Sequence, residues 1–389
     1  MDLSVYFNPL GSELVESLRS DKTTLGATVH KYVEKDNFPD FTDHHIAIIG
    51  VPESRGSNEN KGCAAAPDQV RNFLYQLKKL DYPYKIVDLG NLIPGEKLSD
   101  TYAAVSSIMA ELLKEKVLPV IIGGSQDITY AQYAAYQKME ETVNIVSVDS
   151  HFDLGTTEEK IHSKSYLGKI ILHEPNFLFN FSNIGYQTYF TGTDAIELME
   201  KLFFDTYRLG HVRKDIEETE PIIRNADIFS FDISSVKQSD APGNAFASPN
   251  GFYGDEACQI ARYAGLSDKL TSAGFYELNP DFDLHGQTAH LTAQMIWYFI
   301  DGFYNRKKDM PVTDKKSFTK YRVAIKKTDH EIVFFKSHKS DRWWMEVPYQ
   351  NSKTRYYRHH LVPCSYKDYE VACSGEMPDR WWQAFQKLS

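Results

Sequence analysis

The stretch "VNIVSVDSHFDLG" (143–155) joins a strand-forming run to a group of metal-binding residue types. Its first residues are mostly β-branched, which favours a buried β-strand. Asp149, His151 and Asp153 then follow two residues apart, a spacing that puts side chains on one side of an extended chain. Carboxylate and imidazole donors of this kind suit Mn²⁺ or Zn²⁺. We therefore expect a strand end and a metal site to coincide here.

Runs of the same apolar, strand-like character recur before residue 235, with helical patterns between them. The predicted strands are 45–51, 84–90, 117–124, 143–150, 181–186 and 226–234, and the predicted helices are 67–80, 99–116, 128–140 and 195–210. Repeated strand-then-helix units predict an α/β fold, a three-layer, doubly wound and mostly parallel sheet. Ligands of such sheets bind beyond the carboxyl ends of the strands, where the opening cluster lies.

The composition changes near residue 305. From Arg306 onward the chain has 18 Lys and Arg against 10 Asp and Glu, although the whole chain carries a net charge of −10. Four of the five tryptophans also lie in this segment. Period-two runs such as "EIVFFKS" (331–337) follow a closing helix at 292–303 and favour short strands. We predict one domain over residues 1–304 and a small basic, β-rich C-terminal extension over 305–389.

The sequence has neither a basic start with an apolar run nor an apolar run of about 18 residues, so we expect no signal peptide and no membrane span. The cytoplasm is the expected compartment. The four cysteines are too few and too scattered for a disulfide framework or a zinc knuckle, and we expect reduced thiols.

A second source of carboxylate comes from "SFDISS" (230–235), where Asp232 ends another predicted strand. Parallel strands of one sheet bring their carboxyl ends to the same edge. We therefore expect Asp232 to lie near Asp149, His151 and Asp153. Asp127 precedes the helix predicted at 128–140, and we expect it to cap that helix.

Several motifs follow one another in order along the chain. They are "IAIIGVPESRG" (46–56), "GCAAAPDQVRNFL" (62–74), "VDLGNL" (87–92), "PVIIGGSQDIT" (119–129), "VDSHFD" (148–153), "SFDISSVKQSDAPG" (230–243), "GFYGDEACQIARYAG" (251–265) and "AGFYELNPDFD" (273–283). Together they resemble the ureohydrolase family of arginase, agmatinase and formimidoylglutamase. The resemblance covers about residues 45–303. It implies an arginase-like or deacetylase-like α/β fold.

The resemblance also implies a site for two Mn²⁺ ions held by two His and four Asp. Matched position by position, the retained ligands are Asp149, His151, Asp153 and Asp232. The sequence departs from the family where Gln126 replaces a His and Ser234 replaces an Asp. Three carboxylates balance two divalent ions less well than four, so we expect at most one weakly held ion, Mn²⁺ or Zn²⁺, or none. Asp149, His151 and Asp232 alone resemble the single-metal site of the deacetylases.

Residues on the substrate side follow from the same resemblance. Glu277 matches a family glutamate expected to bind the cationic amidine or guanidine group, a charge-assisted contact. His162 and Ser163 lie in the loop where the family contacts its substrate, as candidates for proton transfer and for a carboxylate contact. A solvent-facing loop histidine remains an equal alternative for His162.

Two functions follow. The first is a C–N hydrolase of linear amidines or guanidines, formimidoylglutamase-like or agmatinase-like, with weak, single-metal or lost activity. The second is a non-catalytic relative that serves binding or assembly, with the C-terminal extension contacting a protein partner. Nucleic-acid binding by the basic extension is less favoured, because "KSHKSDRWW" and "SKTRYYRHH" match no known motif. The resemblance also implies a homo-oligomer.

Overall fold

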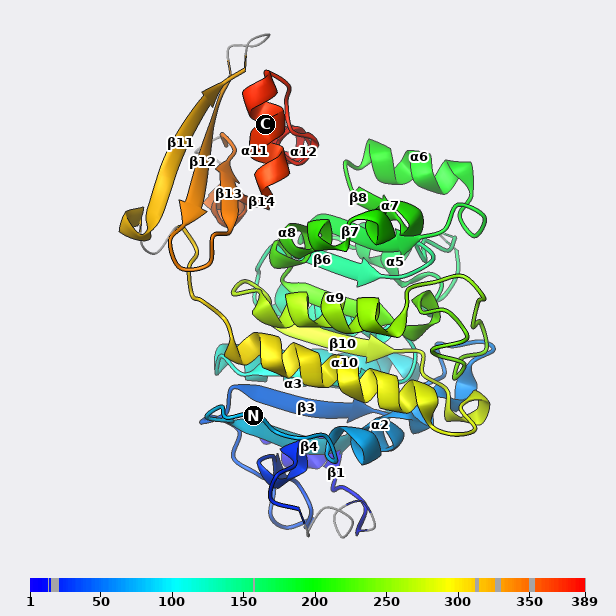
Figure 1. The fold of residues 1–389 in the computed structure, drawn as a ribbon. Coiled ribbons are helices and arrows are strands. Elements are labelled where there is room, and N and C mark those ends of the chain that lie inside the picture. Colours follow the sequence, from blue (N-terminus) through cyan, green and yellow to red (C-terminus); the bar gives the residue numbers. More distant parts are fainter. Residues whose placement is uncertain are drawn as a thin grey trace.

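A single large sheet forms the body of the molecule (Figure 1). The computed structural model describes residues 1–12, 14, 21–156, 158–311, 315–325, 330–349 and 354–388. In this part of the chain the strand order is β1-β4-β3-β5-β10-β9-β6-β7-β8, with β2 beside β4. Only β1 runs antiparallel to its neighbour among these described strands. The strands are β1 Phe7–Asn8, β2 His30–Lys31, β3 Ile46–Val51, β4 Ile86–Leu92, β5 Leu118–Gly123, β6 Val143–Val148, β7 Leu178–Tyr186, β8 Asp205–Arg208, β9 Ile228–Asp232 and β10 Ser272–Tyr276.

Helices cover both faces of this sheet because its central strands are apolar on both sides. In β3, Ile46 and Ile48 face one apolar layer, while Ala47 and Ile49 face the other. The first layer contains α2 Ala66–Leu74, α7 Leu209–Lys214, α8 Thr219–Arg224, α9 Gly254–Leu266 and α10 Gln287–Tyr304. The second contains α3 Leu98–Lys114, α4 Ile128–Lys138, α5 Tyr166–Ile171 and α6 Thr193–Lys201.

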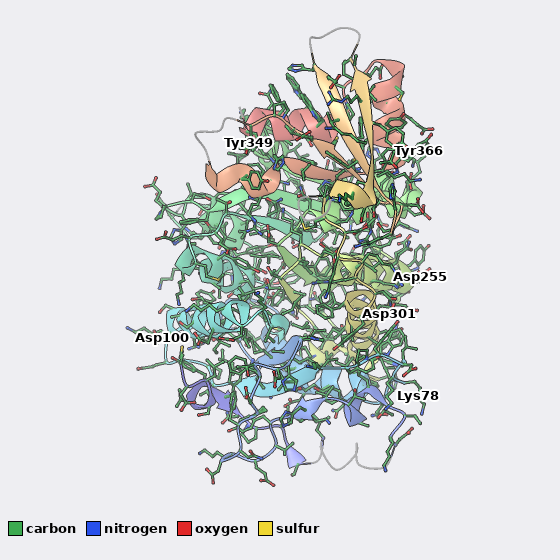
Figure 2. The ribbon with its side chains drawn as sticks, turned by 90° about the vertical axis from the view of Figure 1, so that its left-hand side faces the viewer. Lys78, Asp100, Asp255, Asp301, Tyr349 and Tyr366 are labelled. Atoms are coloured by element: carbon green, nitrogen blue, oxygen red, sulfur yellow. The ribbon has the colours of Figure 1, made fainter. Side chains whose placement is uncertain are left out.

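Figure 2 shows the two helical layers from the side, with Asp100 of α3 on one flank and Asp255 of α9 and Asp301 of α10 on the other. The predicted three-layer, mostly parallel α/β architecture is confirmed. Among the described residues, no helix combines the length and the apolar character needed to cross a bilayer.

The C-terminal segment forms a separate antiparallel sheet, as expected for a β-rich extension. Its strands pair in the order β11-β12-β13-β14. Two helices pack against this sheet, and together they lie beside α8 at the β7–β8 end of the main sheet (Figure 1). The elements are β11 Phe318–Ala324, β12 Glu331–Ser337, β13 Trp343–Glu346, β14 Leu361–Cys364, α11 Tyr366–Ser374 and α12 Asp379–Leu388.

The helix predicted over 195–210 is wrong in its second half. The helix α6 ends at Lys201, and residues 205–208 form β8, which pairs with β7. The apolar spacing of "LMEKLFF" (198–204) continues past the helix end because Phe204 still packs against the second layer. A four-residue edge strand that is only half buried gives too weak a periodic signal to compete with it.

Candidate functional site

The candidate site lies where the four central strands end. The adjacent strands β5, β10, β9 and β6 are parallel, so their carboxyl ends meet at one edge of the sheet. Asp149 directly follows β6, Asp232 ends β9, Glu277 directly follows β10, and Gln126 lies just beyond β5. All four side chains are buried. The expectation that Asp232 comes to the same edge as Asp149 therefore agrees with the observed topology.

The metal-binding triplet itself lies in a loop. The strand β6 ends at Val148, so Asp149, His151 and Asp153 do not alternate along a pleat as the spacing predicted. Instead, Asp149 Oδ1 accepts a hydrogen bond from the His151 backbone N–H at 2.8 Å, and Asp153 has a left-handed φ of 52°. The triplet therefore lies on a turn directly after the strand end and not on the strand itself.

His151 is held by neighbours on both sides of its ring. Its Nδ1 lies 2.9 Å from Ser150 Oγ, and its ring stacks on Phe190 with centroids 4.9 Å apart. Its Nδ1 lies 3.9 Å from Asp149 Oδ1. Burial and the positive charge of Lys164 lower the pKa of His151 to about 4, so the ring is neutral near pH 7.

Lys164 is the residue that the sequence did not reveal. Its Nζ lies 3.6 Å from Asp153 Oδ1 and 3.7 Å from Asp232 Oδ2. Burial alone would lower the pKa of this ammonium, but the surrounding carboxylates outweigh burial and raise the pKa above its ordinary value. Lys164 is therefore a cation placed among the predicted metal ligands. Nothing in "HSKSYLG" (162–168) distinguishes this lysine from a surface lysine.

The carboxyl groups around Lys164 hold protons more tightly than usual. Burial, with Asp149 nearby, raises the pKa of Asp232 to about 6 and that of Asp153 well above its ordinary value. Several polar atoms here are buried and have no hydrogen-bond partner within the described part of the chain. They are Gln126 Oε1, Asp149 Oδ2, Asp153 Oδ1 and Oδ2, Asp232 Oδ2 and Ser234 Oγ.

The Glu277 carboxylate is surrounded by hydrogen-bond donors. Its Oε1 accepts from the Gln126 backbone N–H at 2.9 Å, and its Oε2 accepts from Asn60 Nδ2 at 2.8 Å and from Ser57 Oγ at 3.4 Å. The Glu277 backbone has a φ of 68°, which few residues other than glycine adopt. Burial and the nearby Asp232 raise the pKa of Glu277 to about 8. Sequence reasoning missed Ser57 and Asn60, although both follow the predicted strand 45–51.

Gln126 and Ser234, the two residues that replace family metal ligands, form hydrogen bonds within the protein. Gln126 donates through Nε2 to Ser147 Oγ at 3.2 Å and to Ser230 Oγ at 3.3 Å. Ser234 donates its backbone N–H to Asp232 Oδ1 at 2.7 Å. Within the described residues, no group of three or more His, Cys, Asp or Glu side chains has the arrangement of a metal site.

His162 and Ser163 lie in the loop that delivers Lys164. His162 Nε2 lies 3.0 Å from Glu159 Oε2, and its Nδ1 accepts the Lys164 backbone N–H at 3.2 Å. Both ring nitrogens thus have partners inside the loop. Ser163 is buried and donates its backbone N–H to the Gly56 carbonyl at 3.0 Å.

Asp127 does not cap α4 through its side chain. The residue precedes the helix, but its carboxylate makes no cap hydrogen bond and accepts the Tyr102 hydroxyl instead. The same carboxylate fills the space beside Gly56, where a Cβ would lie 2.2 Å from its Oδ2. Asp127 therefore packs the loop that carries Ser57 toward Glu277, which is a correction to the predicted cap.

A mostly parallel sheet lies between two layers of helices, and buried carboxylates lie beyond the ends of its central strands. This is the arrangement of an arginase-like α/β protein. A sequence model of the arginase family matches residues 44–301, and the chain belongs to that family. The formimidoylglutamase of Staphylococcus aureus strain MSSA476 is 27% identical over 279 residues, which cover 69% of this chain and 88% of that relative.

Solved structures are similar over the same region. Trypanosoma cruzi formiminoglutamase with Mn²⁺ superposes with a TM-score of 0.64 at 24% identity, covering 69% of this chain and 96% of that chain. Formimidoylglutamase from Bacillus subtilis gives a TM-score of 0.65 at 19% identity, with 74% and 94% covered. At these identities the likeness is one of fold.

Proposed function

We propose that the chain is a formimidoylglutamase-like member of the arginase family whose site binds a linear amidinium or guanidinium compound through Glu277. The observation that carries this proposal is the buried Glu277 carboxylate, oriented by Asn60 and the Gln126 backbone N–H beside the strand-end carboxylates. A planar cation with two parallel N–H groups matches a carboxylate in a bidentate way. The similarity to formimidoylglutamases supports the same substrate class.

Hydrolysis in this family depends on a pair of metal ions. The family's two-metal chemistry would need Asp149, His151, Asp153 and Asp232 as ligands, with help from positions 126 and 234. The residues present do not fit that metal pair, because an amide and a hydroxyl replace two strong ligands and the Lys164 ammonium lies among the remaining ones. We infer that C–N hydrolysis is weak or lost.

The proposed roles of the loop residues follow from their contacts. For His162 to transfer a proton to a substrate, it must first leave Glu159. Ser163 remains the proposed contact for a substrate carboxylate. It is buried, and the hydrogen bond from its backbone N–H to the Gly56 carbonyl fixes its position. A His162→Ala variant that keeps full binding would show that ligand binding does not need the His162 side chain.

Isothermal titration calorimetry tests the binding proposal. The full-length protein, without added metal, is titrated with formimidoylglutamate, agmatine and arginine, and with glutamate as a compound that lacks the amidine. We expect saturable binding of at least one amidine or guanidine compound, lost in Glu277→Gln and retained in the exposed control Glu197→Gln. Equal binding by wild type and Glu277→Gln would contradict it.

A hydrolysis assay then separates binding from turnover. Each compound that binds is incubated with protein and Mn²⁺, and the amine product is measured by chromatography. We expect little or no product above the protein-free control. Turnover at a rate typical of enzymes would contradict the inference that hydrolysis is weak or lost.

A second candidate function is binding or assembly without catalysis. The cation among the metal-ligand positions favours it, as do the exposed aromatic side chains on helical segments of the C-terminal extension, which include Tyr357, Tyr366 and Trp382. We propose that the protein forms homo-oligomers and that the extension can contact a protein partner. Light scattering on the full chain, with Trp382→Ser as the surface variant, tests whether the exposed Trp382 side chain supports assembly.

A further inference from the structure

We propose that the ammonium of Lys164 takes the place of the family's metal ions, so that a side-chain cation holds the strand-end carboxylates together. Asp153 comes from the loop after β6, and Asp232 comes from the end of β9. Lys164 Nζ lies 3.6 Å from one and 3.7 Å from the other, so it bridges two neighbouring strands as a bound cation would. This inference concerns the protein without its ligand and is independent of the proposed binding at Glu277.

The loop that carries Lys164 is fixed on both sides of this residue. Before it, the Ser163 backbone N–H donates to the Gly56 carbonyl at 3.0 Å. After it, Ser165 Oγ accepts from the His162 backbone N–H at 3.0 Å, and the Leu167 N–H donates to the Asp153 carbonyl at 3.2 Å. Backbone hydrogen bonds on both sides therefore fix the Lys164 backbone, and the side chain extends from it to the carboxylates.

The surroundings of the Lys164 side chain favour an internal cation. The carboxylates of Asp153 and Asp232 are buried, and a nearby positive charge stabilises a buried carboxylate in its ionised form. The side chain of Lys164 is 31% exposed, and its Nζ also lies 5.7 Å from the centre of the Phe246 ring. The two carboxylates and the aromatic ring both stabilise the ammonium group at this position.

A metal ion and Lys164 would compete for the same oxygen atoms. Asp153 Oδ1 and Asp232 Oδ2 are the atoms that face Lys164, and neither accepts a hydrogen bond among the described residues. A divalent ion bound to these atoms would lie next to a positive charge at low effective dielectric, where repulsion is strong. The replacements at 126 and 234 weaken the metal's side of this competition further.

The experiment measures metal binding by the full-length protein and its variants. Lys164→Met removes the charge and keeps the side-chain length, Lys164→Arg keeps the charge, and Lys160→Met is the exposed control on the same loop. Each protein is equilibrated with Mn²⁺ or Zn²⁺ and freed of unbound metal. Elemental mass spectrometry then gives the ions per chain, and thermal melting is recorded with and without metal.

We expect no stoichiometric metal in wild type, Lys164→Arg or Lys160→Met, and about one ion per chain in Lys164→Met with a higher melting temperature. The double variant Lys164→Met with Asp232→Ala should lose that ion. A Lys164→Met protein that folds poorly alone and recovers its melting temperature with Mn²⁺ would also support the proposal.

Three results would overturn it. The first is a wild-type protein that holds an ion which Asp232→Ala removes, because Lys164 would then coexist with the metal. The second is a folded Lys164→Met that binds no more metal than wild type. The third is a Lys164→Met that misfolds and is not rescued by metal. Failure of the binding proposal at Glu277 would appear in calorimetry and would leave all these metal measurements unchanged.

Discussion

Two residues of the candidate site have backbone conformations that side chains other than glycine rarely adopt. Asp153, in the loop after β6, has a φ of 52°, and Glu277, directly after β10, has a φ of 68°. Such conformations persist only where the surrounding structure imposes them, and they concentrate at functional sites. The strained Glu277 backbone carries a buried carboxylate that accepts from three donors. This combination indicates that the Glu277 carboxylate has a role in binding.

The first prediction concerns pH and Glu277. The pKa of Glu277 is raised to about 8, so the carboxyl is mostly protonated at pH 7 and must lose its proton to bind a cation. Affinity for an amidinium compound should therefore rise with pH, by up to about tenfold per unit below pH 8, and level off above it. Calorimetry at pH 6 to 9 measures this, with the proton release checked in buffers of different ionisation enthalpy. A flat profile would contradict the assignment of Glu277 as the anchor.

The second prediction concerns the buried ion pair between Arg71 and Asp88. Both side chains are fully buried, and Arg71 Nε lies 2.7 Å from Asp88 Oδ2. Replacing Arg71 by Met leaves a buried carboxylate without its cation, which should lower the free energy of unfolding by about 3–5 kcal/mol. Urea denaturation measures the change. Asp68→Asn removes an exposed partner of Arg71 and should change stability by less than about 1 kcal/mol.

At the scale of elements, strand ends and loops differ in how well the sequence predicts them. Asp149 and Asp232 could be placed together because each ends an apolar run and parallel strands share one edge, whereas Glu277 was predicted from the family resemblance. Lys164 could not be placed, because its position depends on loop contacts, such as those with Gly56 and Asp153, that its own sequence does not predict. The proposed ligand roles of the triplet remain predictions that metal analysis must test.

The third prediction concerns the turn after β5 that positions Gln126. A Cβ on Gly124 would lie 1.8 Å from the Glu53 carbonyl oxygen, and backbone atoms cannot move aside as a side chain can. Gly124→Ala should lower the free energy of unfolding by about 1–3 kcal/mol and displace the N–H that Glu277 accepts. Chemical denaturation and ligand titration check both effects. Gly210→Ala meets nothing within 4 Å and should leave both nearly unchanged.

At the scale of the whole molecule, the basic C-terminal segment packs onto the acidic body. Arg358 Nη2 lies 2.5 Å from Asp227, and Arg380 Nη2 lies 2.9 Å from Glu218. His359 stacks on Phe179 with ring centroids 4.0 Å apart. The charge change near residue 305 therefore predicted the existence of the extension, while its contacts with β7 and α8 required the structure. We propose residues 1–304 and 305–389 as two domains joined through this interface.

The fourth prediction tests that interface at Arg224. Its guanidinium donates to the backbone carbonyls of Trp343 and Cys364 at 3.2 Å and lies 4.2 Å from the Trp344 ring centre. Arg224→Ala should lower the free energy of unfolding by about 1.5–3 kcal/mol. Hydrogen exchange should accelerate in β13 and β14 while β3 and β5 stay protected. The exposed Arg322→Ala should leave the exchange of β13 and β14 unchanged, and equal exchange in both variants would contradict the assigned interface.

The strand order also constrains how the chain folds during synthesis. The centre of the sheet, β10 and β9, comes from residues 272–276 and 228–232, after every strand on either side of it has been made. Until then β5 and β6 each have an open inner edge, and unpaired edges invite wrong partners. Because Gln126 and Asp149 lie on opposite sides of this gap, the site closes only when the last two strands insert. If the ribosome paused before residue 276, the nascent chain would have most of the strands of its sheet but would lack a complete site.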